Sequence, residues 1–509
     1  MKDKDDPIMM GIFGGLAFIG LLIVLEPYLP YIFALVVLAG LGVGGFYAWR
    51  IYERTHYRSK KVYVANPSAP PPPDSFDYQE HAQYRERVKS PDAQAPMKPS
   101  EASRLEHCLV VGGSGHGKSQ LLEWLILPDL KRTRPPAIVV LDSKSPHEDY
   151  HRSNMTDRIS RLDIFKERLR DKLIIIDPRD RPALSLFDAP PEEHNHAAAE
   201  VSYFLGTLFE GEVSPTMAAA YQPLVSLMLH VSKVEQERGR PDKKANFDKL
   251  LEAVRNIKQF DHYIDTMPNE VMRKYLKVDF RVSGLVTKTT QNAIARRIHG
   301  MLMPSDDFGA MFNARSNKLN LVDALDHGHV VLINNDIGHL DEHLSAVFGK
   351  AMISRVLTAA RTRKTRNPVW FIIDEAYPYT DKRTQNLLRQ LRSYGLGATF
   401  AYQDFKDVET SLQRTLANNT TVKYVGGGSP EHASFFSQIF RVSPDFIMEQ
   451  TKDPKEPPEF TRFAYHIKDK MAAAQSMTLP LGLLDKEPRM SDEDYEQLRV
   501  SNRLRLQEN

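Results

Sequence analysis

A glycine-rich segment near residue 115 carries the residue types with the most specific chemistry in this chain. It fits the pattern G-x-x-x-x-G-K-[ST] and consists of Gly112, Gly113, Ser114, Gly115, His116, Gly117, Lys118 and Ser119. An apolar run, Cys108–Val111, precedes it, and a run with an apolar face, Gln120–Leu127, follows it. A loop of this kind between a buried strand and a helix predicts a phosphate-binding site.

The residue types in this loop match what a triphosphate requires. Glycines allow left-handed backbone angles, so consecutive N–H groups can approach the phosphate oxygens at the positive end of the following helix. We expect the Lys118 ammonium to bind the β- and γ-phosphates and the Ser119 hydroxyl to coordinate Mg²⁺. Gln120 completes the predicted nucleotide-binding set. The cofactors that this set predicts are ATP and Mg²⁺.

A second segment supplies the carboxylates that a phosphate loop needs. The run Val369–Ile373 is apolar, as expected for a central parallel strand covered on both faces, and Asp374 and Glu375 follow it directly. Ligands bind at the carboxyl ends of strands in open α/β sheets. We therefore expect Asp374 to hold Mg²⁺ through water, and Glu375 to be the base that orients the attacking water.

Two further polar groups suit the γ-phosphate. Gln403 ends the next apolar run, where an amide can sense the phosphate or place the water. Arg389 and Arg392 lie on a predicted helix, Gln385–Ser393. Ring ATPases use an arginine from a neighbouring subunit at this phosphate, but a helical arginine also commonly forms a surface ion pair. Both interpretations of Arg392 stay open at this point.

The remaining charged segments give weaker signals. Two basic runs each allow a functional and a structural interpretation, and two histidines allow only a structural one. The basic runs 131–134 and 361–366 could contact a phosphate backbone or could simply end helices, where cations are favoured. We interpret His194 and His196 as the start of a surface helix, because no other metal ligand is placed nearby.

Composition narrows the class of protein. The net charge of +2 gives no general attraction to nucleic acid, so any basic surface must be local. Cys108 is the only cysteine, which excludes a disulfide or a cysteine zinc site within one chain and suits a reducing cytoplasm. Its place in the predicted strand before the phosphate loop makes it a core residue.

Alternating strand and helix patterns predict an α/β fold with a mostly parallel sheet. The expected strands cover 108–111, 137–142, 173–178, 330–333, 369–374, 398–402 and 421–425. Between about 190 and 303 the period is helical, and the expected helices cover 197–209, 217–231, 247–257 and 290–302. This stretch predicts an all-α insertion between strands of the sheet.

The N-terminal part differs from the rest. Two runs, Ile8–Leu25 and Tyr28–Trp49, contain no charged residue, and Glu26 lies in the turn between them. Each run is about long enough to span a bilayer as a helix. Basic residues follow the second run, so the positive-inside rule places both ends of a two-helix hairpin in the cytoplasm. A cleaved signal peptide is the alternative for the first run. The proline-rich stretch after the hairpin predicts an extended linker.

These patterns predict five regions. They are a transmembrane hairpin at 1–54, a linker at 55–103, an ATPase domain at 104–189 and 304–448, the insertion at 190–303, and a charged C-terminal tail at 449–509. Because periodicity is poor beyond about Met448, we expect the tail to be weakly structured with short helices. It is a candidate partner-binding segment.

The ordered set of features resembles the conjugative (type IV secretion) coupling proteins, membrane-anchored P-loop ATPases of the FtsK/HerA superfamily with a RecA-like core. The resemblance covers roughly 104–440 and the anchor. It implies a homohexameric ring around a DNA channel, catalytic roles for Lys118, Glu375 and Gln403, and a trans-acting arginine that points to Arg392. It also implies that Asp142 and Lys144 are a strand-end acid and lysine of the site. The chain departs from many relatives in two ways. The hairpin has almost no loop between its two helices, where many relatives carry a small periplasmic domain. The C-terminal tail is not clearly of the acidic kind that some relatives use.

The sequence thus predicts a two-pass inner-membrane ATPase that couples Mg·ATP hydrolysis to recruitment and translocation of DNA, or of a DNA–protein conjugate, into a secretion channel. Expected partners are DNA, relaxase or accessory proteins and channel components. The alternatives are a DNA translocase acting within the cell and an ATPase that delivers protein effectors. A receptor in which ATP only assembles a ring is disfavoured, because binding alone would not require Glu375 and Gln403.

Overall fold

The computed structural model describes residues 98–508, except 208–212, 282–284, 381–390 and 407. The chain divides into two units, Met1–Pro72 and Pro73–Asn509, and all described residues belong to the second. The membrane hairpin and most of the linker expected from the sequence lie outside the described residues. Among the residues that are described, no helix is both long and apolar enough to cross a bilayer.

Nine strands form one sheet in the described part of the chain, in the order β3-β4-β2-β5-β6-β1-β7-β8-β9. β1 to β7 are parallel to one another, and β8 and β9 are added antiparallel at one edge. The strands are β1 Cys108–Val111, β2 Ala137–Asp142, β3 Leu173–Ile176, β4 Val330–Asn334, β5 Val369–Ile373, β6 Leu396–Tyr402, β7 Val422–Val425, β8 Phe460–Ile467 and β9 Gln475–Pro480. All seven strands expected from the sequence are therefore present.

Both faces of the sheet are covered, which is why its strands are continuous apolar runs rather than alternating ones. In β1, Leu109 and Val111 belong to one hydrophobic cluster, whereas Cys108 and Val110 belong to the other. Cys108 is buried, as expected, and burial raises the pKa of its thiol to about 11. The first cluster includes helices α14 Asp306–Phe312, α15 Leu321–Asp326, α16 Ile337–Thr362, α18 Thr410–Asn419, α19 Pro430–Phe440 and α20 Pro444–Met448.

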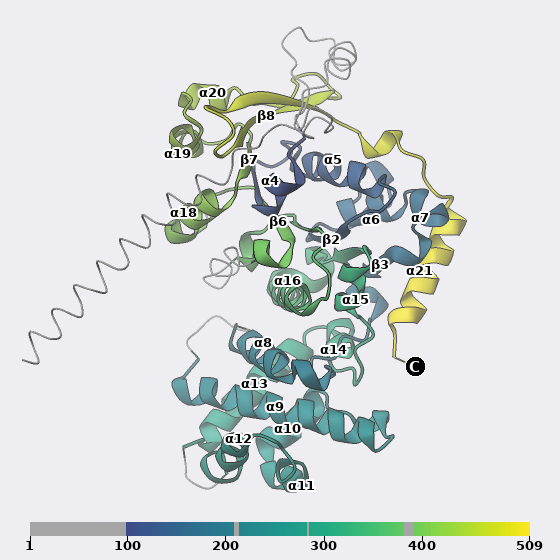
Figure 1. Ribbon diagram of the computed structural model, residues 1–509, viewed down its shortest axis with the longest axis vertical. Coiled ribbons are helices and arrows are strands. Elements are labelled where there is room, and N and C mark those ends of the chain that lie inside the picture. Colours follow the sequence, from purple (N-terminus) through teal and green to yellow (C-terminus); the bar gives the residue numbers. More distant parts are fainter. Residues whose placement is uncertain (1–97, 208–212, 282–284, 381–390, 407, 509) are drawn as a thin grey trace, which may run out of the picture. The chain divides into compact units, whose positions relative to one another are not determined.

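The opposite face is covered by helices from both ends of the described chain. They are α5 Lys118–Leu130, α6 Met155–Ser160, α7 Ile164–Glu167 and α21 Asp492–Leu506, with α4 Glu101–Leu105 beside them. Figure 1 shows α21 lying next to α7 and β3, although it comes more than 300 residues later. Its Asn502 side chain accepts a hydrogen bond from the Ile175 N–H (3.0 Å) and donates one to the Ile175 carbonyl (2.6 Å). The exposed edge of β3 is thereby paired by a side chain, which protects it from another strand.

Between β3 and β4 the described residues form helices and no strand. The larger helices are α8 His194–Thr207, α9 Pro215–Glu237, α10 Phe247–Arg255 and α13 Lys288–Leu302, and the shorter ones are α11 Asp261–Ile264, α12 Glu270–Lys274 and the α14 and α15 given above. Helices α8 to α13 pack on one another around buried side chains such as Phe247 and Leu250, and Figure 1 shows them gathered in one group. The all-α character expected for this segment is observed. The division of the chain into domains remains a prediction.

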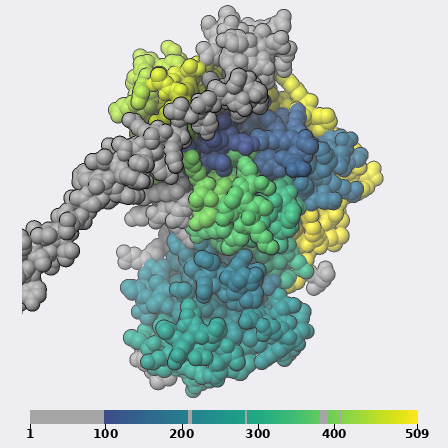
Figure 2. Space-filling view, in the orientation of Figure 1, coloured from purple at the N-terminus to yellow at the C-terminus, as the bar shows by residue number. Residues whose placement is uncertain are grey.

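The segment after Met448 is better ordered than the sequence predicts. The expected weakly structured tail contains β8, β9 and the 15-residue helix α21. The expectation was wrong because these strands lie at the edge of the sheet and carry polar residues, so their apolar pattern is weak. Pairing with β7 stabilises β8 although its own sequence pattern is weak: Val425 of β7 lies opposite Ala464 of β8. Figure 2 shows the yellow C-terminal residues on the surface beside the blue residues of the first helices.

Candidate nucleotide site

The phosphate loop lies between β1 and α5, as its motif predicts. Gly115 (φ 69°) and Gly117 (φ 99°) have left-handed backbone conformations, and Gly117 is the residue from which α5 begins. The Lys118 ammonium donates hydrogen bonds to the carbonyl oxygens of Gly112 (2.9 Å) and Gly113 (3.3 Å). Burial lowers the pKa of Lys118, and the Glu375 and Asp374 carboxylates oppose this shift. The loop therefore places a cation and the positive end of a helix at one point.

Replacing Gly117 by alanine should destabilise the loop. A Cβ at this position would lie 2.9 Å from Thr461 Cγ2 of β8, and an L-residue is strained at a φ of 99°. We expect the free energy of unfolding to fall by about 1–3 kcal/mol, measured by chemical denaturation. Gly113→Ala is the matched control, because no atom lies within 4 Å of its Cβ position and its φ is not positive. Equal stability of the two variants would contradict the expectation.

The C-terminal part of the sheet holds the loop from its other side. The Thr461 hydroxyl donates to the His116 carbonyl (2.6 Å), and His116 Nε2 lies 2.9 Å from the Arg462 carbonyl oxygen. The His116 ring also makes an edge contact with Phe463, with ring centroids 4.9 Å apart. His116 is buried and is not among the residues that line the cavity described below, so its side chain packs against β8, while its place in the nucleotide-binding set remains a prediction.

The carboxyl ends of β2, β5, β6 and β1 meet at one edge of the sheet, because their registers pair Leu141 with Ile373 and Ile373 with Phe400. Asp374 thus reaches the phosphate loop: the Ser119 hydroxyl donates to Asp374 Oδ2 at 2.9 Å. Asp374 has no exposed surface. The two groups that the sequence assigns to Mg²⁺ are therefore in direct contact, although 255 residues separate them.

Lys144 occupies a position between these two oxygens. Its ammonium lies 2.5 Å from Ser119 Oγ and 2.6 Å from Asp374 Oδ2. Burial disfavours the charge of Lys144, but the Asp374 and Asp142 carboxylates outweigh this and raise its pKa. A hydroxyl and a buried carboxylate that share one cation form a donor set of the hard oxygens that Mg²⁺ prefers.

Asp142 forms the floor beneath this cluster. It is fully buried at the end of β2 and accepts hydrogen bonds from the backbone N–H of Lys144 (3.1 Å) and of Met155 (2.8 Å). Burial and the nearby Asp374 charge raise the pKa of Asp142 to about 6. Asp142 therefore fixes the turn that presents Lys144 to the site.

Glu375 projects from a strained backbone. Its φ of 54° is left-handed, and it is fixed by hydrogen bonds on either side, from Asp374 N to Leu141 O (2.9 Å) and from Ala376 N to Ala401 O (2.8 Å). A non-glycine residue held in this region indicates a functional constraint. Burial raises the pKa of Glu375, while Lys118 opposes this shift and Asp374 adds to it.

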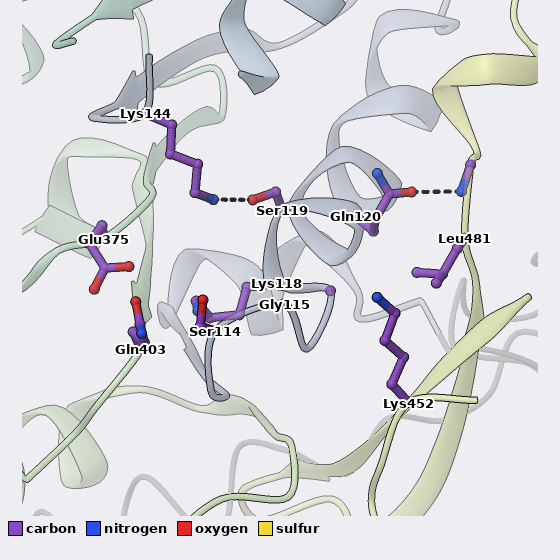
Figure 3. A pocket seen from close by; sticks show the side chains of 12 residues that line it. Ser114, Gly115, Lys118, Ser119, Gln120, Lys144, Glu375, Gln403, Lys452 and Leu481 are labelled. Carbon is purple, nitrogen blue, oxygen red and sulfur yellow. Dashed lines mark hydrogen bonds between the residues drawn. The ribbon is translucent and has the colours of Figure 1, made fainter. Parts of the chain in front are cut away.

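A cavity of about 420 Å³ joins these groups. Of the residues proposed from sequence, it is lined by Ser114, Gly115, Gly117, Lys118, Ser119, Gln120, Lys144, Glu375 and Gln403. Figure 3 shows Glu375 and Gln403 together on one side, across from the phosphate loop. Gly112, Gly113 and Asp374 are not among the lining residues: the two glycine carbonyls accept hydrogen bonds from Lys118, and Asp374 accepts one from Ser119.

The opposite wall of the cavity consists of residues that sequence reasoning missed. They are Lys452, Leu481 and Gly482, all from the segment expected to be a weakly structured tail. Gln120 joins this wall to α5, because its side-chain oxygen accepts a hydrogen bond from the Gly482 N–H at 2.8 Å. No local signal marks these residues, since only the pairing of β8 with β7 brings them to the phosphate loop.

A buried ion pair supports the start of α5 from behind. Gln120 donates to Glu123 (2.9 Å), and Glu123 accepts from Arg158 of α6 at 2.7 Å. Arg158 also contacts Asp485, three residues beyond Gly482, at 3.0 Å. Burial raises the pKa of Glu123 to about 8, although Arg158 opposes the shift. The α5 terminus and the C-terminal wall are thus parts of one hydrogen-bonded network.

Arg392 does not line the cavity. It lies in a short 3₁₀ turn, Arg392–Tyr394, and is 63% exposed, with its guanidinium 2.6 Å from Glu106. Arg389 and most of the helix expected around it lie outside the described residues. Within its own chain Arg392 therefore forms a surface ion pair, and it remains accessible to a neighbouring molecule.

The basic runs mostly have partners within the chain. In the first, Lys131 pairs with Glu487 (2.6 Å) and Arg132 with Asp129 (2.8 Å). In the second, Arg363 donates to the Tyr394 carbonyl (2.6 Å), and Arg366 donates to the Arg363 carbonyl (3.1 Å). These contacts favour the structural interpretation of both runs over direct contact with a phosphate backbone.

A parallel sheet with a phosphate loop after β1 and an acid at the end of β5 defines a P-loop nucleoside triphosphatase fold. The same fold is present in solved structures of the plasmid coupling protein TrwB. TrwB in complex with a non-hydrolysable ATP analogue has 17% sequence identity and a TM-score of 0.52, over 81% of this chain and 94% of that chain. TrwB in complex with ADP and Mg²⁺ has 16% identity and a TM-score of 0.51, over 82% and 95%.

An unbound form of the bacterial conjugative coupling protein TrwBdeltaN70 gives a similar result, with 16% identity, a TM-score of 0.51 and coverage of 81% and 93%. No model of a protein family and no curated protein matches this chain. The likeness therefore establishes a P-loop fold like that of TrwB, which is the fold that the sequence resemblance predicted.

Proposed function

We propose that this chain is an ATPase that couples Mg·ATP hydrolysis to recruitment and translocation of DNA, or of a DNA–protein conjugate, into a conjugation or type IV secretion channel. One observation carries the catalytic part: the Ser119 hydroxyl and the buried Asp374 carboxylate meet at 2.9 Å beside the phosphate loop. The transport part is supported by the coupling-protein fold, whose solved examples include complexes with an ATP analogue and with ADP and Mg²⁺.

The residues of the phosphate loop and of the facing strand ends each have a role in this proposal. The loop N–H groups and Lys118 bind the β- and γ-phosphates, Ser119 and Asp374 hold Mg²⁺, and Glu375 orients the attacking water. Gln403 lies beside Glu375 on the cavity wall and places the same water or the γ-phosphate. When bound, Mg²⁺ neutralises charge that develops on the phosphate oxygens.

The site implies that Lys144 must move when a divalent cation binds. Its ammonium holds the two oxygens that the metal would take. Lys144 is 47% exposed and has a flexible side chain, so it can turn toward the phosphates instead.

The assembly and location of the protein belong to the same proposal. We place it at the inner membrane through the two-helix hairpin, with the soluble part in the cytoplasm, as a homohexamer. Arg392 then acts in trans: its exposure and its position outside its own cavity suit an arginine offered to a neighbouring subunit. Relaxase, accessory and channel proteins are the expected partners.

The test is ATPase activity of the purified full-length chain with and without single- and double-stranded DNA. Mg²⁺-dependent hydrolysis that DNA stimulates supports the proposal. Hydrolysis that DNA leaves unchanged, but that a secreted protein stimulates, would support effector delivery instead. A protein that retains no nucleotide would refute the enzymatic assignment.

As the pH is lowered, hydrolysis should be lost at a higher pH than the titration of an exposed glutamate would predict. Glu375 must be ionised to orient water, and burial raises its pKa. As the pH falls through this raised pKa the carboxylate is protonated and the rate is lost, so the acid limb should lie above the ordinary glutamate value of about 4.3. Single-turnover rates across pH, with circular dichroism to confirm folding, measure this. A flat rate down to that pH would contradict it.

A further inference from the structure

The C-terminal wall of the nucleotide cavity contains a lysine to which the proposed function gives no role. Lys452 lines the cavity together with the phosphate loop. Its backbone is anchored to β8 by an antiparallel bridge to Thr461 and by a hydrogen bond from Arg462 N to Thr451 O at 3.1 Å. Thr461 in turn holds the His116 carbonyl, so position 452 is fixed relative to the loop.

Lys452 differs from the other two lysines of the cavity. Lys118 donates to the Gly112 carbonyl, and Lys144 pairs with Asp374. In the described part of the chain, no hydrogen bond or ion pair engages the Lys452 ammonium. Its charge nevertheless reaches the loop: burial lowers the pKa of His116, and Lys118 and Lys452 lower it further. An unpaired cation that faces a cavity already built for phosphate is suited to an anionic ligand.

The position of Lys452 indicates which part of the ligand it meets. Figure 3 shows Glu375 and Gln403 on one side of the cavity, Lys118 and Gly115 in the middle, and Lys452 on the other side. Glu375 and Gln403 mark the γ-phosphate end. The far side, where Lys452 lies, is therefore the end at which the α-phosphate is joined to the ribose.

We propose that Lys452 binds the α-phosphate side of the nucleotide within its own subunit, an inference that rests on the proposed function. Such a contact is made equally to ATP, to ADP and in the transition state. It therefore contributes uniform binding, which lowers KM and Kd without raising kcat. The same contact connects the strand pair β8–β9 to the bound nucleotide.

The test compares Lys452→Ala with Lys455→Ala in the full-length chain. Lys455 is an exposed lysine three residues further on, and its contact with Glu459 spans 3.9 Å. We expect Lys452→Ala to weaken binding of ADP and ATP alike by about tenfold or more, as for a lost charge-assisted hydrogen bond. At saturating ATP its kcat should stay within a factor of about two. Lys455→Ala should bind like wild type, and Lys452→Arg should restore most of the affinity.

The outcomes separate this inference from the function on which it rests. Wild-type protein that binds no nucleotide overturns both. Wild-type binding with an unchanged Kd for Lys452→Ala overturns only the inference. A lower kcat with unchanged affinity would place Lys452 at the γ-phosphate, and a loss confined to DNA binding would assign it to nucleic acid. Both results refute the α-phosphate contact, and thermal melting of each variant controls for folding.

Discussion

Replacing Lys118 by alanine should abolish ATP hydrolysis while the protein still folds. The ammonium lies at the start of α5, within the loop whose carbonyls at Gly112 and Gly113 it contacts. Burial lowers the pKa of Lys118, so keeping it charged already has a cost that bound phosphate would offset. A preorganised charge at the transferring phosphate is worth about 100- to 1000-fold in rate. We expect at least that loss in kcat/KM.

Lys131→Ala is the matched control for this variant. Lys131 follows the other end of the same helix and pairs with Glu487 at the surface, away from the cavity. It should hydrolyse ATP at close to the wild-type rate. Phosphate release by both purified proteins measures the difference, and circular dichroism confirms folding. If Lys118→Ala hydrolyses ATP like wild type, the phosphate site has been assigned to the wrong residues.

Replacing Glu375 by glutamine should give a protein that binds ATP and stalls. The change removes the carboxylate but keeps the size of the side chain, so the strained turn at φ 54° and its flanking hydrogen bonds should persist. General-base groups contribute about 10²- to 10⁴-fold to rate, and we expect kcat to fall by that factor. Affinity for ATP should be nearly unchanged, or higher, because a negative charge next to the phosphates is lost.

Glu409→Gln provides the same chemical change outside the cavity, at the residue before α18. Its kcat should equal that of wild type. Binding is measured with a fluorescent nucleotide, and turnover by phosphate release. Wild-type turnover in Glu375→Gln would refute the role of Glu375, while loss of binding with turnover would show that the carboxylate positions the loop rather than the water.

Much of the candidate nucleotide site could be predicted because each part of it is a short contiguous segment. One contiguous motif marks the loop from Gly112 to Ser119, which lies between a buried strand and a helix. The apolar run of β5 indicates that the acid directly after it lies at the end of a buried strand. Parallel strands bring their carboxyl ends to one edge. The contact between Ser119 and Asp374 follows from those two facts alone.

Arg392 shows where such reasoning stops. A sequence can place an arginine on an element, but the group that it contacts depends on the surrounding fold and on neighbouring subunits. Here its partner within the chain is Glu106. A role in trans is therefore a proposal about the assembly.

The amino-acid sequence by itself determined where the phosphate loop lies, which acids follow β5, that the core is mostly parallel, and that helices separate β3 from β4. Only the tertiary structure decided that the C-terminal residues complete the cavity. Lys452 and Gly482 reach the loop through β8, an edge strand with mixed polarity whose partner β7 precedes it by 35 residues or more. Local patterns report burial on a regular element, whereas an edge strand is stabilised by pairing with a distant segment. That is why this wall, and the anchoring of His116 to Arg462, could not be inferred from composition or spacing.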